Sequence, residues 1–181
     1  FPFSIKLLSE RVLYTEPDRG DVIVFKTPAD NRTDYIKRLI GKPGDIIQFV
    51  NGDLYLNKKK IEKEFVKKDT VLCGQEKIEV NIYKEKITED SEYQIAYFAN
   101  DSMTDTDSYT VPKDHFFFLG ANRDCSKDSR FLMSVGYVNK ENLVGKARFL
   151  FFSNNQSIGN FFTFWRWHNS IRFNRILKKI I

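Results

Sequence analysis

The 181-residue sequence has few of the residues that build metal sites or disulfide frameworks. It contains two histidines, His115 and His168, and two cysteines, Cys73 and Cys125, with no CxxC or HExxH spacing among them. We therefore expect no metal site and no cofactor, because zinc sites of the common kinds need closely spaced His or Cys ligands. Two distant cysteines leave open both their pairing and the redox compartment.

Long apolar runs are also absent. No stretch of the sequence has the roughly 20 consecutive apolar residues that a membrane-spanning helix requires. The sequence starts at Phe1 and not at Met, and we expect a further segment to precede it.

Acidic residues are missing from positions 161–181, which hold five basic residues. The net charge of +5 therefore belongs to this tail, and positions 1–160 are electrically balanced. A balanced body argues against a nucleic-acid partner. The tail joins the aromatic stretch 161–167 to an amphipathic pattern over 173–181, which predicts a C-terminal helix. That helix would dock on an anionic membrane surface, or else pack under the body with its arginines in water.

The body has the composition of one β-rich domain. Hydrophobic residues make up 41% and charged residues 29%, which excludes a disordered chain, and the 17 phenylalanines favour strands. Asn51-Gly52 between two alternating runs predicts a hairpin of residues 46–50 and 53–56, and Pro43-Gly44 predicts a type II turn. We expect further strands at residues 21–25, 35–40, 79–83, 93–98, 115–119 and 143–152.

Residues 57–110 differ from their surroundings, because they are rich in Lys and Glu. We interpret them as a solvated antiparallel insert subdomain. The predicted organisation is a catalytic β core at residues 1–56 and 111–160, the insert at 57–110, and the aromatic and basic tail at 161–181.

Two segments could carry chemistry. On the strand predicted at 35–40, Lys37 shares a face with Tyr35 and Leu39, and Arg38 lies on the opposite face. Burial among apolar side chains would lower the pKa of Lys37 and make it a base, although most strand lysines simply reach water. The second segment, Gly120–Arg130, is dense in polar residues and could equally be a structural loop that satisfies its own hydrogen bonds.

These segments, in their order along the chain, closely resemble the conserved boxes of bacterial type I signal peptidases (leader peptidases). The boxes that match are Arg19-Gly-Asp-Val-Ile-Val-Phe25, Tyr35-Ile-Lys-Arg38 with Gly41-x-Pro-Gly-Asp45, Gly120–Arg130, Asn142-Leu-Val-Gly145 and Ile171-Arg-Phe-Asn-Arg-Ile176. The resemblance implies a mostly β fold of antiparallel sheets: a signal-peptidase-like β-barrel core, a small β insert and a C-terminal amphipathic helix.

The resemblance also implies a serine endopeptidase with a Ser/Lys dyad that removes signal peptides from exported preproteins. Lys37 would be the general base and Ser126 the residue that orients it. Asp128 and Arg130 would form a structural ion pair near the site, and Arg38 would be a further structural residue near it. The enzyme would be anchored in the bacterial cytoplasmic membrane, with its catalytic domain on the outer, periplasmic face.

This sequence departs from the family pattern in three ways. Cys125 replaces a residue that is often Asn. Ala121 stands where the family usually has Asp, which removes a partner for Arg38. The family's Pro-Ser-x-Ser-Met box of the nucleophile should lie upstream of Arg19, but it does not occur in the sequence, so we expect it before Phe1 and expect residues 1–181 alone to be inactive. The alternative is a non-catalytic β-domain that binds membrane surfaces or peptides.

Overall fold

The computed structural model describes residues 15–100, 102, 105–150 and 178–179. The described residues form antiparallel strands and one short 3-10 helix, η1 (Lys140–Asn142). The mostly β architecture with antiparallel sheets that we expected from the sequence is therefore confirmed.

A five-stranded sheet holds most of the segments that the sequence singled out. Its order is β11-β10-β2-β1-β12. The strands are β11 (Val138–Asn139), β10 (His115–Leu119), β2 (Asp34–Gly41), β1 (Val22–Lys26) and β12 (Leu143–Lys146). β2 lies in the middle of this sheet, so residues on it are held by hydrogen-bonded neighbours on both sides.

A second sheet has the order β5-β4-β3-β9. Its strands are β5 (Lys59–Lys60), β4 (Asp53–Leu56), β3 (Ile46–Val50) and β9 (Tyr109–Thr110). The predicted hairpin is confirmed, since Val50 pairs with Asp53 across Asn51 and Gly52, whose φ angles of 51° and 74° fit a type I′ turn. Gly44 has a φ of 87°, as the predicted Pro-Gly turn requires.

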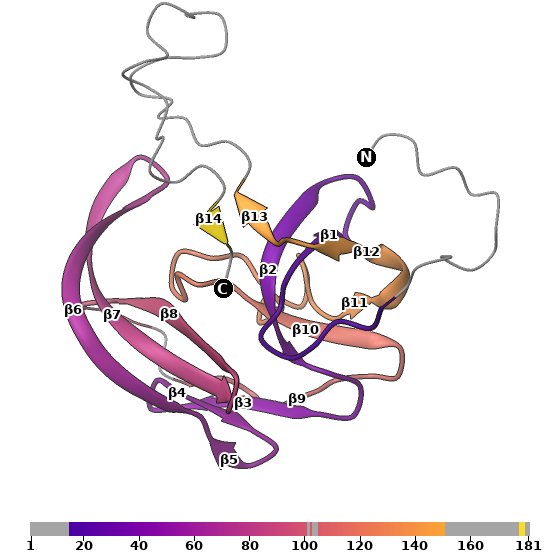
Figure 1. The fold of residues 1–181 in the computed structure, drawn as a ribbon, viewed down its shortest axis with the longest axis horizontal. Coiled ribbons are helices and arrows are strands. Elements are labelled where there is room, and N and C mark those ends of the chain that lie inside the picture. Colours follow the sequence, from indigo (N-terminus) through magenta and orange to yellow (C-terminus); the bar gives the residue numbers. More distant parts are fainter. Residues whose placement is uncertain (1–14, 101, 103–104, 151–177, 180–181) are drawn as a thin grey trace, which may run out of the picture.

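The third sheet lies on the other side of the molecule from β1, β2 and β12, as Figure 1 shows. It is a meander of β6 (Glu62–Cys73), β7 (Glu76–Thr88) and β8 (Ser91–Phe98). One face of β7 and β8 is buried and the other is exposed, which is the alternation that the sequence of the insert predicts.

The hydrophobic core joins this third sheet to the other two. Ile95 and Tyr97 on β8 pack in one cluster with Phe49 on β3 and with Phe117 and Leu119 on β10. A second cluster lies on the other face of the five-stranded sheet and contains Ile23, Phe25, Leu39, Phe116, Phe118, Val135, Val138 and Leu143. The division of the chain into core and insert stays a prediction. Residues from the predicted insert and from the predicted core pack in the same hydrophobic cluster.

The end of the chain differs from the sequence prediction at Lys178 and Lys179. The predicted amphipathic helix is wrong for these two residues. They form strand β14 (Lys178–Lys179), which pairs with β13 (Phe149–Leu150), so backbone pairing to a distant segment overrides the local helical pattern. The rest of the predicted helix and the aromatic stretch 161–167 lie outside the described residues.

The closed barrel is not confirmed. Each sheet has two end strands in the described part of the chain. Within residues 15–100, 102, 105–150 and 178–179, no helix has the length and apolar character needed to cross a membrane.

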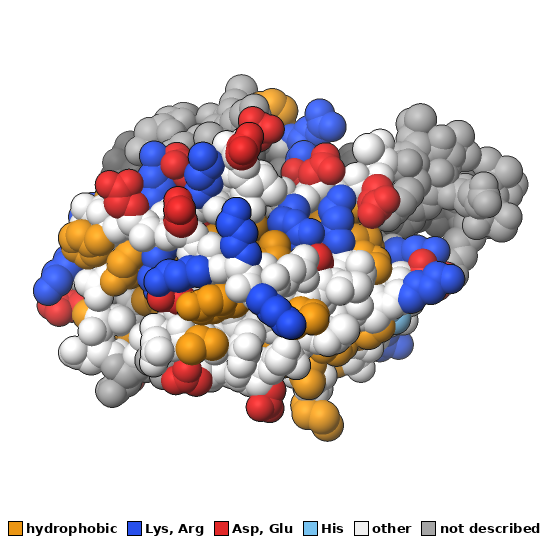
Figure 2. All heavy atoms as spheres, turned by 90° about the horizontal axis from the view of Figure 1, so that it is seen from below, with side chains coloured by type: hydrophobic (Ala, Val, Ile, Leu, Met, Phe, Trp, Pro, Cys, Tyr) orange, Lys and Arg blue, Asp and Glu red, His pale blue; other side chains and the backbone are white. Residues whose placement is uncertain are grey.

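The surface reflects the balanced charge of the body. On the face drawn in Figure 2, Lys and Arg side chains are interspersed with Asp and Glu and with hydrophobic side chains. A hollow on the outward side of β3 and β4 is lined by Ile46, Gln48, Val50, Tyr55 and Lys58. None of these residues belongs to the segments singled out for chemistry.

Candidate active site

Lys37 lies near the middle of β2 and is held in place from both sides. It stands opposite Ile23 of β1, and the next residue, Arg38, stands opposite Leu119 of β10. Strand alternation puts Lys37 on the same face as Tyr35 and Leu39, which contribute to the second hydrophobic cluster. Its Nζ lies 5.5 Å from the centre of the Tyr35 ring.

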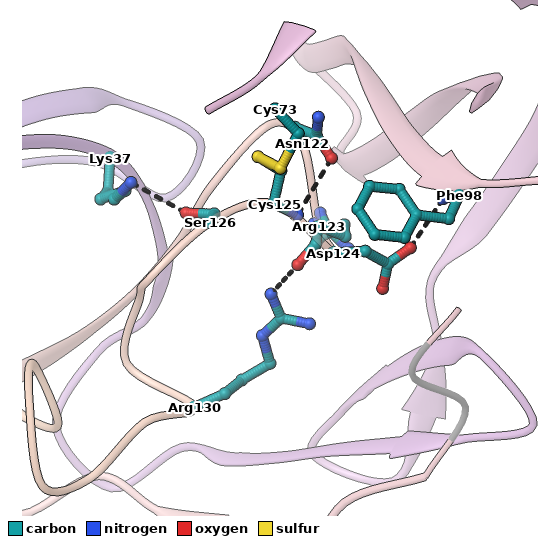
Figure 3. Close-up of a disulfide and its surroundings, with 9 residues drawn as sticks. All are labelled: Lys37, Cys73, Phe98, Asn122, Arg123, Asp124, Cys125, Ser126 and Arg130. Carbon is teal, nitrogen blue, oxygen red and sulfur yellow. Dashed lines mark hydrogen bonds between the residues drawn. A yellow bond between two sulfur atoms is a disulfide. The ribbon is translucent and has the colours of Figure 1, made fainter. Parts of the chain in front are cut away.

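The ammonium group of Lys37 contacts a residue 89 positions away. Lys37 Nζ donates a hydrogen bond of 2.8 Å to Ser126 Oγ. Figure 3 shows the two side chains pointing toward each other, Lys37 from β2 and Ser126 from the loop after β10. The structure thus brings together the two residues that the sequence predicted for a base and its orienting serine.

The surroundings of Lys37 favour its neutral form. Burial lowers the pKa of Lys37 below its ordinary value of 10.5, because the charged form loses water. The Asp128 carboxylate opposes this effect and the Arg130 guanidinium adds to it. Since Asp128 and Arg130 are paired with each other, their fields at Lys37 partly cancel and burial decides the direction.

Asp128 and Arg130, which follow Ser126 in the loop, form a buried bidentate pair. Arg130 Nε lies 2.9 Å from Asp128 Oδ1, and a second guanidinium nitrogen lies 2.9 Å from Asp128 Oδ2. Asp128 Oδ2 also accepts from the backbone N–H of Gly120 at 3.0 Å, and Arg130 donates to the carbonyl of Arg123. These bonds close the loop on itself, as a loop dense in polar residues can.

The loop is also pinned to β10. Ser129 Oγ accepts from the N–H of Phe118 at 2.9 Å, and the N–H of Ser129 donates to the Phe118 carbonyl at 3.0 Å. At its start, Gly120 leaves room that Ser126 fills. A Cβ at position 120 would lie 2.0 Å from Ser126 Oγ, so the close approach requires glycine.

Arg38 lies on the opposite face of β2, as strand alternation predicted. Its guanidinium stacks on the Tyr93 ring at 3.8 Å and donates to the Gly20 carbonyl at 2.6 Å. The sequence had suggested that Ala121 removes a partner of Arg38. In this chain the aromatic ring of β8 contacts the guanidinium instead.

Sequence reasoning missed a buried charged cluster behind the loop. Arg123 and Glu85 are both 1% exposed, and their side chains form two hydrogen bonds of 2.5 and 3.0 Å. Tyr93 donates to Glu85, and Arg123 donates to the Tyr97 hydroxyl. Burial alone would lower the pKa of Arg123, but the charge and hydrogen bond of Glu85, together with Tyr97 and Tyr93, outweigh burial and hold that pKa above its ordinary value. No local pattern could pair residues 38 positions apart.

The two cysteines, whose pairing the sequence left open, form a disulfide. Cys73 ends β6 and Cys125 precedes Ser126 in the loop, and their Cα atoms are 5.8 Å apart. In the described part of the chain, no group of three or more His, Cys, Asp or Glu side chains is placed to hold a metal ion.

Comparison with known proteins decides the family. The family model described as "Signal peptidase, peptidase S26" matches residues 5–152. This range includes Lys37, the loop that carries Ser126, and β12. This chain belongs to the signal peptidase family. The resemblance read from the sequence motifs is thereby confirmed.

Curated relatives agree with this assignment. The proteins named signal peptidase I from Rickettsia typhi and Rickettsia conorii are each 38% identical to this chain over 191 aligned positions. The alignments cover 97% of this chain and 70% of each relative. Signal peptidase I from Rickettsia bellii is 35% identical, with 97% of this chain and 64% of the relative covered.

Solved structures of other proteins match as well. The crystal structure of a signal peptidase I from Enterococcus faecalis V583 is 25% identical, and the match covers 74% of this chain and 97% of that one. The TM-score of 0.43 is too low to establish a shared fold, so the family assignment rests on the sequences.

Proposed function

We propose that this chain supplies the general base of a signal peptidase that removes signal peptides from exported preproteins by serine catalysis. Lys37 is the base in this proposal. The observation that carries it is the hydrogen bond of 2.8 Å between Lys37 Nζ and Ser126 Oγ in surroundings that lower the pKa of Lys37. Family membership supplies the reaction class.

The mechanism follows from the chemistry of a neutral lysine. Uncharged Lys37 takes the proton of the attacking serine hydroxyl, and the serine oxygen adds to the scissile carbonyl. Lys37 then gives the proton to the amine that leaves as the C–N bond breaks, and a water molecule, deprotonated by Lys37, cleaves the acyl-serine ester and restores the serine hydroxyl. Ser126 orients Nζ for these transfers, and the Asp128–Arg130 pair supports the loop that carries Ser126. A lysine base near neutrality needs a lowered pKa, which burial of Lys37 favours.

The attacking serine comes from outside residues 1–181 in this proposal. The Pro-Ser-x-Ser-Met pattern of the family's nucleophile does not occur in the sequence. Ser126 is itself hydrogen-bonded to the lysine, so a pair formed by Ser126 and Lys37 alone is the second candidate for the dyad.

The proposed location is the outer, periplasmic face of the bacterial cytoplasmic membrane, where the basic tail contacts anionic lipid. The Cys73–Cys125 disulfide supports a site outside the cytoplasm, because disulfides persist in oxidising compartments. The proposed substrates are preproteins with small residues before the cleavage site.

A cleavage assay tests the proposal. The full-length protein that contains residues 1–181 is mixed with a preprotein bearing an Ala-x-Ala cleavage site, as wild type, Lys37→Ala and Lys60→Ala. We expect Lys37→Ala to lose about 10²-fold to 10⁴-fold in kcat/KM, the usual contribution of a general base, and Lys60→Ala to keep wild-type activity. An active Lys37→Ala enzyme would contradict the proposal, and no cleavage by any form would favour the non-catalytic β-domain.

The nucleophile is identified in the same preparation. An acylating serine probe is reacted with the wild type, and the labelled peptide is found by mass spectrometry. Label on a serine outside residues 1–181 supports the proposed dyad. Label on Ser126, lost in Ser126→Ala, would instead make Ser126 the nucleophile.

A further inference from the structure

The loop that carries Ser126 is fastened to the third sheet at successive residues. The N–H of Ala96 on β8 donates to the Ala121 carbonyl, and the N–H of Arg123 donates to the Ala96 carbonyl, each at 2.8 Å. Asp124 Oδ2 accepts from the N–H of Phe98 at 2.7 Å. Cys125 continues this series with a covalent bond to the last residue of β6.

The disulfide is the last of these links between the loop and the third sheet before Ser126. In Figure 3 it lies between the Lys37–Ser126 pair and the end of β8 at Phe98. Before it, the N–H of Cys125 donates to Asn122 Oδ1 at 3.2 Å; after it, Lys127 is exposed, and the loop is next held at buried Asp128. The side-chain hydrogen bond found for Ser126 is the one to Lys37, so the covalent bond of its neighbour limits where Ser126 Oγ can lie.

We infer that the Cys73–Cys125 disulfide is a positioning element for Lys37: by tying the loop to β6 it holds Ser126 Oγ against Nζ and keeps water from the amine. The catalytic meaning of this inference rests on the proposed function. Cys73 and Cys125 are positioning residues in this inference, because they act on Lys37 through Ser126, whose Oγ is the hydrogen-bond partner of Lys37 Nζ. β6 thereby acts on a base that belongs to a different sheet.

The pKa of the Lys37 amine reports on whether the loop stays in place, because the pKa depends on the groups that face the amine. They are Tyr35 on β2, uncharged Ile23 on β1, and Asp128 and Arg130 from the loop. Three of these do not depend on the disulfide for their position, because Tyr35 and Ile23 are in the sheet and Asp128 is anchored to Gly120. Loosening residues 124–127 would therefore act on Lys37 mainly by admitting water.

The first test needs no peptidase activity. The pH dependence of acetylation of Lys37 and Lys60 by trace acetic anhydride is followed by mass spectrometry in the folded protein. It is compared between oxidised protein, protein reduced with a phosphine, and the Cys73→Ser/Cys125→Ser variant with and without the phosphine. We expect the acetylation midpoint of Lys37 to rise toward 10.5 when the disulfide is reduced, and to be raised in the variant as well. Adding the phosphine to the variant should not change its Lys37 midpoint. The midpoint of Lys60 should be the same in all four samples.

The second test measures catalysis in the full-length protein. We expect kcat/KM near neutral pH to fall about tenfold for each pH unit by which the Lys37 midpoint rises, because the neutral fraction of a base below its pKa falls by that factor. The acid limb of the pH–rate profile moves by the same amount, and KM changes less than kcat. A purely structural role would instead lower the amount of active enzyme equally at every pH.

The outcomes are separable. An unmoved Lys37 midpoint in protein whose two thiols are shown to be free and whose circular dichroism is unchanged would overturn the inference, and so would global unfolding on reduction. If the midpoint moves but no form cleaves a preprotein, the positioning role stands and the proposed function fails.

Discussion

Two lysines in different regions of this molecule have opposite electrostatic surroundings. Lys37 is half-buried on the central strand β2, and among the described residues no carboxylate lies within ion-pair distance of it, so burial lowers its pKa. Lys60 lies exposed on β5, where the hydrogen bond and charge of Asp53, 2.5 Å away, raise its pKa. A lysine becomes a base when it loses water without gaining a carboxylate.

The largest expected effect is on peptidase activity, when each of the two lysines is replaced by arginine and its positive charge is kept. Arginine cannot be deprotonated in a protein, so Lys37→Arg in the full-length protein should lose about 10²-fold to 10⁴-fold in peptidase kcat/KM. Lys60→Arg keeps its contact with Asp53 and should remain at wild-type activity. Equal activities of the two variants in a preprotein cleavage assay would remove the functional difference between the two regions.

Arg123 is a third cation to compare with the two lysines. It is buried like Lys37, but it is paired with a carboxylate, that of Glu85. Glu85→Ala leaves the fully buried guanidinium without its charged partner, which should cost about 3–5 kcal/mol of unfolding free energy. Urea unfolding followed by tryptophan or tyrosine fluorescence measures this. Glu92→Ala, which removes the exposed partner of Lys84 on the same hairpin, is the matched control and should leave the unfolding midpoint nearly unchanged.

A smaller loss is expected from a single methyl group beside the site. Gly120→Ala places a Cβ on Ser126 Oγ, and such overpacking typically costs about 1–3 kcal/mol of stability. Gly74→Ala is a less suitable control because φ is 64° there, whereas Gly145→Ala meets no atom within 4 Å and tests an added methyl alone. If Gly120→Ala is as stable as Gly145→Ala and as active as wild type, Ser126 is not confined as we describe.

The smallest effect concerns stability as a function of pH. The folded-state pKa of Lys37 is below 10.5, so the unfolded chain binds more protons between these values and stability rises with pH there. Lys37→Met should therefore be more stable than wild type at neutral pH, by a margin that narrows as pH approaches 10.5. Lys60→Met should show the opposite sign, because a raised pKa contributes stability below 10.5 that is lost at higher pH.

Urea midpoints measured from pH 7 to pH 11 check both signs. The difference that remains at the highest pH gives the packing contribution of methionine at each position. Two curves of the same sign would contradict the opposite surroundings of the two lysines.

Local features of this fold could be predicted well from the sequence. β10 has the predicted bounds, and the hairpin at Asn51-Gly52 follows from the turn chemistry of these two residues. Alternation along β2 also placed Lys37 and Arg38 on opposite faces. These features depend on neighbours within a few positions, where propensity and pleat decide.

Contacts between distant segments could not be predicted in the same way. Nothing near Cys73 indicates Cys125, and nothing near Glu85 indicates Arg123, because tertiary packing of the third sheet on the loop creates both pairs. Lys178 and Lys179 were also beyond local prediction, because their strand pairing with β13 is non-local. For the Lys37–Ser126 pair, the family motifs supplied the link that local patterns lack.

Direct titration of the two lysines tests the central claim. Nuclear magnetic resonance of the ε-carbons, assigned with Lys37→Arg and Lys60→Arg, follows each amine between pH 6 and pH 12 in the folded, oxidised protein. Our account predicts that Lys37 titrates below 10.5 and Lys60 above it. A Lys37 that titrates at or above 10.5 would contradict its assignment as a base.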